Sequence, residues 1–154
     1  MQKMTNLLNQ QLDALLENET DIVSNMANAS ALLNQSLEQI NWVGFYRYVK
    51  NHNELILGPF QGNVACMHIK NGDGVCGTAF TDRHPLRVPD VHQFAGHIAC
   101  DANSKSEIVI PLYKQEIPIG VLDIDSPVLN RFSEDDERLL SEFGSVFLKH
   151  VALS

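Results

Sequence analysis

The segment "SEIVIPLYKQEIPIGVLDID" (Ser106–Asp125) is the part of the sequence that indicates the fold most strongly. It contains two runs rich in aliphatic residues, Ser106–Lys114 and Ile117–Asp125, and only Gln115 and Glu116 separate them. Runs of this length and composition are typical of strands, and a two-residue connection joins antiparallel neighbours. The segment therefore predicts a β-hairpin at the centre of the domain.

Shorter elements precede this hairpin. The aromatic run "NWVGFYRYV" (Asn41–Val49) and the run "ELILGPF" (Glu54–Phe60) flank a polar turn and predict a second hairpin. A third strand is expected within Asn63–Lys70 and a brief one at Leu86–Val88. The small residues of Gly74–Asp82 fit one helical segment packed close to the sheet.

Both ends of the chain carry a helical period. Residues 4–37 predict two short helices, because their apolar residues recur three and four positions apart. The first stripe consists of Leu7, Leu8, Leu12, Leu15 and Leu16. A C-terminal helix is expected after Ser133, which suits an N-cap and is followed by acidic residues.

This order of elements predicts an α+β fold in a single domain spanning residues 1–154. The N-terminal helices occupy residues 1–38, and the sheet core with the C-terminal helix occupies residues 40–152. We expect a central antiparallel sheet with the N- and C-terminal helices packed on one face and loops forming a pocket on the other.

Composition excludes several classes of partner. The 154 residues include 11 basic and 19 acidic side chains, for a net charge of −8. Nucleic acids and anionic membranes require clustered Lys and Arg, so neither is expected as a partner. No apolar segment is long enough to span a bilayer, and the acidic N-terminal region resembles neither a signal nor a transit peptide. A cytoplasmic location is expected.

The cysteines Cys66, Cys76 and Cys100 are an odd number, which argues against a permanent disulfide framework. Each is expected near a loop or a strand edge. Three interpretations stay open: unrelated buried thiols, a zinc site, or a redox pair. The histidines nearest in sequence are His68, His92 and His97. No C-x2-C or H-x3-H pair is present, so no metal and no cofactor are expected.

The main hairpin also gathers acidic residues. Asp123 and Asp125 are two apart on a strand and project from one face, and Glu107 falls roughly opposite them across the turn. Such residues can be a solvated sheet edge. Like charges side by side are nevertheless unfavourable unless a cation is bound or one acid keeps its proton. Acidic neighbours, Asp101 among them, are also expected to raise the pKa of the Cys100 thiol.

Two aromatic residues, Trp42 and Tyr46, lie four apart on one face of the strand Asn41–Val49. Aromatic residues on a strand face belong more often to the core than to a ligand site. The sequence leaves both roles open.

Together these blocks resemble a known family. The runs "INWVGFY", "LGPFQG", "ACMHI", "GDGVCGTA", "VPDVHQFAGHIACDANSKSEIVIPL" and "IGVLDIDSP" are similar to those of the free methionine-(R)-sulfoxide reductases, which are built on a single GAF domain. The resemblance extends from about Ile40 to the C-terminal helix and keeps the order of the blocks.

The resemblance implies a role for each candidate residue. Cys100 corresponds to the nucleophile, Cys66 to the cysteine that forms a disulfide with it, and Cys76 to an accessory cysteine. The residues implied to contact the substrate are Glu107, Asp123, Asp125, Trp42 and Tyr46. The implied reaction reduces free L-methionine-(R)-sulfoxide to methionine, with thioredoxin as the reductant.

Two other functions stay open on the sequence. GAF domains also serve as sensors of small ligands, although such modules usually control an output domain, for which this chain has little room. A thiol redox switch without a small substrate is the second alternative. A homodimer through the amphipathic N-terminal helices is an expectation that the sequence does not decide.

Overall fold

The computed structural model describes residues 2–97, 100 and 102–153, so Asp101 lies outside the described residues. Within this part of the chain, helices and strands alternate with short 3₁₀ turns at Lys50–His52 and Val91–Gln93. The helices are α1 (Gln2–Leu15), α2 (Ile22–Ser36), α3 (Gly74–Asp82) and α4 (Glu134–Lys149). The strands are β1 (Trp42–Val49), β2 (Glu54–Gly62), β3 (His68–Lys70), β4 (Leu86–Val88), β5 (Ser106–Lys114) and β6 (Ile117–Ser126). None of the described helices has the length and apolar character to cross a membrane.

The strands form one six-stranded sheet in the order β3-β2-β1-β6-β5-β4, and all neighbours are antiparallel. The predicted hairpin β5–β6 lies within the sheet, with Ile110 opposite Leu122 and Lys114 opposite Ile117. Gln115 and Glu116 both have positive φ, as a tight turn between twisted strands requires. The predicted hairpin is therefore confirmed, but an irregularity between Leu112 and Tyr113 shifts the register by one residue, so that Ile110 lies opposite Leu122 and not, as counting back from the turn predicts, opposite Val121.

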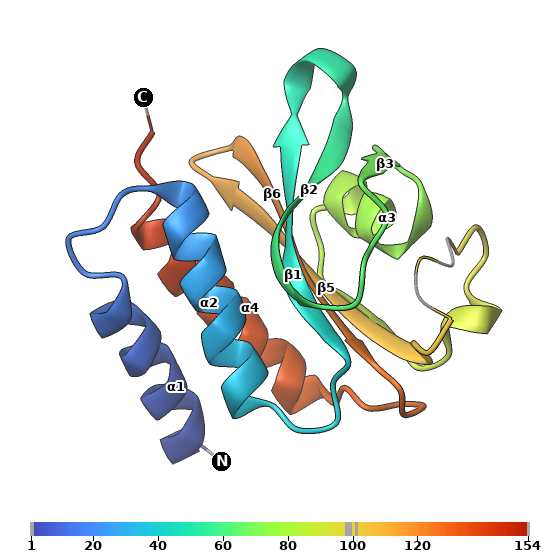
Figure 1. Cartoon of the computed structure of the whole chain (residues 1–154), viewed down its shortest axis with the longest axis horizontal. Coiled ribbons are helices and arrows are strands. Elements are labelled where there is room, and N and C mark those ends of the chain that lie inside the picture. The colour runs from blue at the N-terminus through green and yellow to red at the C-terminus, as the bar shows by residue number, and fades with distance from the viewer. Residues whose placement is uncertain (1, 98–99, 101, 154) are drawn as a thin grey trace.

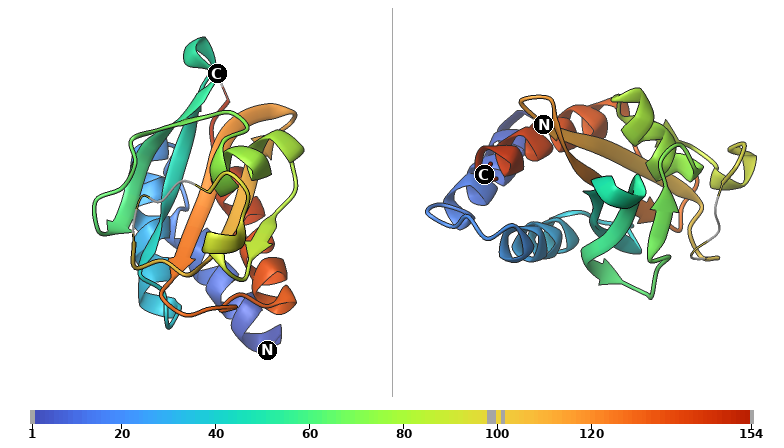
Figure 2. Two further views of the ribbon diagram at one scale, coloured as in Figure 1. Left: turned by 90° about the vertical axis from the view of Figure 1, so that its right-hand side faces the viewer. Right: turned by 90° about the horizontal axis from the view of Figure 1, so that it is seen from above.

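The two faces of the sheet carry different layers. Helices α1, α2 and α4 lie on one side of the sheet, and α3 lies on the other with the 3₁₀ turn Val91–Gln93 (Figures 1 and 2). The larger hydrophobic cluster, on the side of the three long helices, includes Phe45, Leu122 and Phe143, all at most 1% exposed. The smaller cluster, on the side of α3, includes Val109 and Val121. Alternation along each strand thus separates the core from the pocket side.

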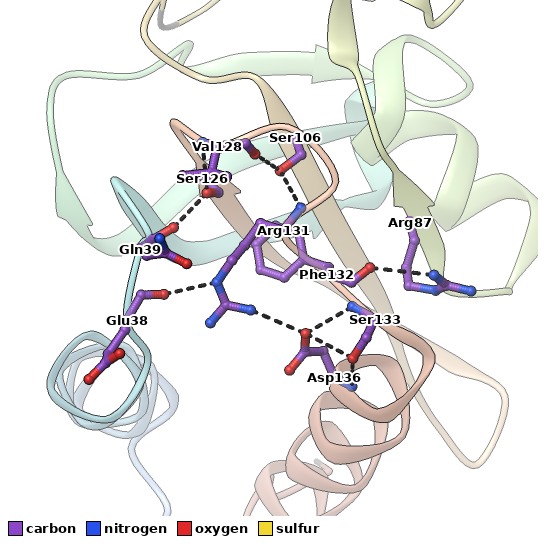
Figure 3. A network of polar contacts seen from close by, with 10 residues as sticks. All are labelled: Glu38, Gln39, Arg87, Ser106, Ser126, Val128, Arg131, Phe132, Ser133 and Asp136. Carbon is purple, nitrogen blue, oxygen red and sulfur yellow. Dashed lines mark hydrogen bonds and ion pairs between the residues drawn. The ribbon is translucent and has the colours of Figure 1, made fainter.

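Polar contacts fix the end of the hairpin that lies far from its turn. Ser106 and Ser126 are paired across β5 and β6, and both are fully buried. The Ser126 hydroxyl donates to the Gln39 carbonyl at 2.5 Å, and the Ser106 hydroxyl donates to the Val128 carbonyl at 2.6 Å (Figure 3). Since buried hydroxyls need such partners, the Ser126 bond holds the end of β6 against the α2–β1 connection, and the Ser106 bond holds the start of β5 against the segment that follows β6.

Arg131 extends the same network toward α4. Its Nε donates to the Glu38 carbonyl at 3.0 Å, and its Nη1 lies 3.2 Å from Asp136 Oδ2 (Figure 3). Asp136 and Ser133 form a reciprocal capping box, which confirms Ser133 as the predicted N-cap. The start of α4 is therefore anchored to the segment that joins α2 and β1.

Two sequence predictions need correction. Only His68–Lys70 of the predicted strand Asn63–Lys70 is a strand, because residues 63–67 leave the sheet edge as a loop. The apolar stripe of α1 is also narrower than predicted, since Leu7 and Leu15 are 56% and 46% exposed.

Candidate active site

Three carboxyl groups meet on the face of the sheet that α3 covers. The hairpin register places Glu107 opposite Asp125 and Val109 opposite Asp123. Glu107 and Asp123 are buried, at 7% and 5% exposure, and Asp125 is half-buried. The predicted cluster of acids is therefore present, and its burial distinguishes it from a solvated sheet edge.

Helix α3 adds a thiol to this cluster. Cys76 lies in its first turn, only 4% exposed, and its Sγ lies 3.9 Å from Glu107 Oε2 as a hydrogen-bond donor. Cys76 lies beside the turn that precedes α3, in the segment predicted as helical, and α3 packs directly over β5 and β6. The thiol thus faces the acids.

Burial controls the protonation of this cluster. Desolvation, followed by repulsion from Asp123 and Asp125, raises the pKa of Glu107 well above its ordinary value. Desolvation also raises the pKa of Asp123, but hydrogen bonds from Glu107 and Cys76 oppose that rise. Desolvation, followed by repulsion from Asp123 and Glu107, also raises the pKa of the buried Cys76 thiol. Of the two buried acids, Glu107 is thus the one that keeps a proton, with Asp123 as its acceptor.

A disulfide joins Cys66 and Cys100 beside the acids, with their Cα atoms 5.4 Å apart. These are the two cysteines that the family resemblance pairs. Two side chains of β1 hold the loop that carries Cys66: the Tyr46 hydroxyl donates to the Cys66 carbonyl at 2.9 Å, and Trp42 Nε1 donates to the Asn63 carbonyl at 3.1 Å. The loop departs from the sheet edge in this way and brings Cys66 to Cys100.

The same two aromatic rings form one wall of the site. Trp42 stacks on Tyr46 and on Phe60, with ring centroids 5.9 and 5.1 Å away. Gly44 makes this possible, because a Cβ there would lie 2.3 Å from the Phe60 Cβ. Trp42 and Tyr46 are buried and belong to the smaller core cluster as well as to the wall. Both of the roles left open by the sequence are thus compatible with their positions.

These groups enclose a cavity of about 50 Å³. Every site residue predicted from the sequence except Cys66 lines this cavity. These lining residues are Trp42, Tyr46, Cys76, Cys100, Glu107, Asp123 and Asp125. No Lys or Arg is among the described residues that line it. A site with this lining attracts a positively charged group.

The structure adds residues that the sequence did not single out for this site. Asp73 and Ser104 line the cavity, and so does His97, whose pKa is lowered by partial burial and by His92. A signal for Asp73 was present, because "GDGVCG" places it three residues before Cys76 at the start of a helix. Ser104 carried no such signal.

The cavity also contains a set of metal-ligand atoms. Cys76 Sγ and one carboxylate oxygen each of Glu107 and Asp123 lie within 4.8 Å of one another. Spacing rules based on C-x2-C pairs cannot detect such a set, because its members come from α3, β5 and β6. That the protein needs no metal or cofactor stays a prediction.

The buried proton of Glu107 gives the first testable prediction. Below about pH 4.5, its ordinary pKa, Glu107 is protonated in both the folded and the unfolded protein. As pH rises above that value, the unfolded chain loses the proton while the folded protein keeps it. The group's contribution to stability is therefore lost between the ordinary and the raised pKa, at about 1.4 kcal/mol per pH unit for one full proton.

Urea unfolding from pH 4 to pH 8 measures this effect in Glu107→Gln, whose amide cannot ionise. We expect wild type to lose stability relative to this variant as pH rises. Glu17→Gln is the matched control, because it makes the same change of side chain at an exposed position. Parallel curves for wild type and Glu107→Gln would contradict the assignment of the proton.

Comparisons with known proteins identify the family of this chain. The GAF domain family model matches residues 11–147. The free methionine-R-sulfoxide reductase of Escherichia coli is 51% identical over 145 residues, which cover 94% of this chain and 87% of that protein.

Two solved structures with bound substrate share the fold. The fRMsr of Staphylococcus aureus, in complex with substrate, is 53% identical with a TM-score of 0.90, and the match covers 96% of this chain and 95% of that one. The free methionine-R-sulfoxide reductase of Neisseria meningitidis, in complex with its substrate, is 40% identical with a TM-score of 0.91. That match covers 95% of this chain and 87% of the other.

Proposed function

Because the chain belongs to the GAF-domain family that includes the free methionine-R-sulfoxide reductases, we propose that it reduces free L-methionine-(R)-sulfoxide to methionine. One observation supports this most: Cys100, whose sulfur forms a disulfide with Cys66, lines the same cavity as Glu107, which keeps a proton. A nucleophilic sulfur and a proton donor beside one small cavity are the groups that this reduction needs.

The reaction begins with attack of Cys100 Sγ on the sulfoxide sulfur. Glu107 donates its proton to the sulfoxide oxygen, which makes the sulfur electrophilic. The oxygen passes to Cys100 as a sulfenic acid, and methionine leaves. The Cys66 thiol then attacks this sulfenic acid, which forms the disulfide and releases water.

A dithiol reductant completes the cycle by exchange with the disulfide. We propose thioredoxin as this reductant. The loop around Cys66 suits an approaching partner, because its two large hydrophobic side chains, Val64 and Met67, are 86% and 67% exposed. Two electrons from the reductant thus convert one sulfoxide to one thioether and one water.

The charges of the site favour a free amino acid over a peptide. A free substrate carries an α-ammonium group, which the carboxylates of Asp123 and Asp125 attract, whereas a peptide nitrogen carries no charge. The first turn of α3, whose Gly74 and Val75 line the cavity, offers backbone N–H groups to the α-carboxylate. The rings of Trp42 and Tyr46 would pack against the methyl end.

A direct assay tests this proposal. We expect the reduced protein to consume free methionine-(R)-sulfoxide with dithiothreitol or a thioredoxin system. We expect kcat/KM for the N-acetylated substrate to be lower than that for the free amino acid by a factor of about 100 or more, because the ammonium contact is lost. Binding without turnover would favour a sensor, and equal rates for both substrates would contradict the role of the acids. The (R) preference, the cytoplasmic location and a homodimer stay predictions.

A further inference from the structure

We propose that the same cavity, once the disulfide is reduced, binds a thiophilic divalent cation such as Zn²⁺ and is thereby closed to the substrate. The ligands would be the thiolates of Cys76 and Cys100 and the carboxylates of Glu107 and Asp123, and binding would release to solvent the protons that Glu107 and the thiols hold without the cation. The cation is an inhibitory occupant and not a cofactor. The binding claim stands on the geometry alone, whereas its inhibitory meaning rests on the proposed function.

The geometry is close to what zinc requires. The three atoms from Cys76, Glu107 and Asp123 lie within 4.8 Å of one another. Tetrahedral zinc with thiolate and carboxylate ligands places ligand atoms about 3.3 to 3.8 Å apart. Small side-chain rotations toward a shared centre would supply this difference, and the ion would lie in the cavity that these three residues line.

An unsatisfied oxygen points independently to a missing ligand. Asp123 is only 5% exposed, lines the cavity and accepts hydrogen bonds from Glu107 and Cys76, yet its Oδ1 is buried with no hydrogen-bond partner among the described residues. Burial of a carboxylate oxygen without a partner is costly. A cation would satisfy it, and no Lys or Arg among the described lining residues competes for that position.

The donor set selects the type of ion. One or two thiolates with carboxylates favour Zn²⁺ or Co²⁺ over Mg²⁺ and Ca²⁺, which prefer oxygen ligands only. Cys100 lines the cavity, but its sulfur is occupied by the bond to Cys66. Reduction of that bond releases a thiolate and completes a four-ligand set, so affinity for the cation should depend on the redox state.

Zinc titration against a chromophoric indicator, without any substrate, tests the site. We expect one Zn²⁺ per reduced chain. We expect affinity to fall by about 10- to 100-fold or more in Cys76→Ser, in Asp123→Asn and in the disulfide form of wild type. Co²⁺ provides a second readout, because its thiolate-to-metal absorption band should weaken in Cys76→Ser even if that variant binds cobalt through other ligands.

Cys66→Ser is the matched control. Cys66 does not line the cavity, and its replacement leaves Cys100 without a disulfide partner. This variant should bind Zn²⁺ with the affinity of the reduced wild type. Zinc affinity that is unchanged in both Cys76→Ser and Asp123→Asn would overturn the proposal. Binding that is lost only in His68→Gln would also overturn it, by locating the ion at the exposed His68–Glu54 pair.

The outcomes separate this inference from the proposed function. Turnover in metal-free buffer without zinc binding refutes the cation site alone. Zinc binding without turnover refutes the enzymatic function and its inhibitory consequence, but supports the site. If both hold, added Zn²⁺ should raise KM for the sulfoxide and leave kcat unchanged under rapid exchange, and chelation should restore the rate.

Discussion

Replacing Cys100 by serine should lower kcat/KM for free methionine-(R)-sulfoxide by about 10⁴-fold or more. A serine hydroxyl is a poor nucleophile toward a sulfoxide sulfur and cannot accept its oxygen as a sulfenic acid. Cys100 lines the cavity beside Glu107. Among the described lining residues, Cys76 is the one other thiol that could attack the sulfoxide in its place. Steady-state rates with dithiothreitol measure the loss.

Two cysteine variants act as controls for that loss. Cys66→Ser should still release about one equivalent of methionine per chain in a first turnover, because it removes only the thiol that resolves the sulfenic acid. Cys76→Ser should lose less than about 10-fold, because its thiol contacts Glu107 without reacting. If Cys76→Ser lost as much activity as Cys100→Ser, the assignment of the nucleophile would be wrong.

The second large effect concerns Glu107. Glu107→Gln should lower kcat by about 10²- to 10⁴-fold, the usual range for loss of a general acid. Glutamine keeps the size and a hydrogen-bond donor toward Asp123, but it has no acidic proton to transfer. In wild type, kcat should fall as pH rises through the raised pKa of Glu107, since only the protonated acid is active. The variant should lack this decline.

Asp125→Asn provides the contrast for Glu107→Gln. Asp125 lies opposite Glu107 in the hairpin but is only half-buried, and its proposed role is to attract the substrate's ammonium group. We expect its loss mainly to raise KM and to preserve the pH dependence of kcat. An equal loss of kcat in both variants, with both pH profiles flat, would move the proton donor to Asp125.

Sequence patterns were sufficient where local rules act. Strand alternation and the two-residue turn predicted the hairpin of β5 and β6 and the meeting of Glu107 with Asp123 and Asp125, although not the one-residue shift of register between Leu112 and Tyr113. Strand periodicity also placed Trp42 and Tyr46 on one face. These features depend on neighbours in a single hairpin or strand, so composition and spacing determine them.

Tertiary packing decided what the sequence did not predict. The run Asn63–Cys66 has strand-like composition, but Tyr46 and Trp42 bind its backbone and draw it away from the sheet edge toward Cys100. The position of α3 over β5 and β6 likewise brings Cys76 to Glu107. No pattern in a single sequence encodes how a helix docks across a sheet.

A single-turnover experiment on the reduced wild-type protein tests directly whether Cys100 reduces the sulfoxide and Cys66 then forms the disulfide. The protein is freed of reductant, mixed with excess free methionine-(R)-sulfoxide and quenched with an alkylating agent. Methionine is then quantified, and the disulfides are mapped by mass spectrometry. If Cys100 attacks the sulfoxide and Cys66 resolves the sulfenic acid, we expect about one methionine per chain, a Cys66–Cys100 disulfide and an alkylated Cys76. Absence of methionine, or a disulfide that joins Cys76 to Cys100, would contradict this mechanism.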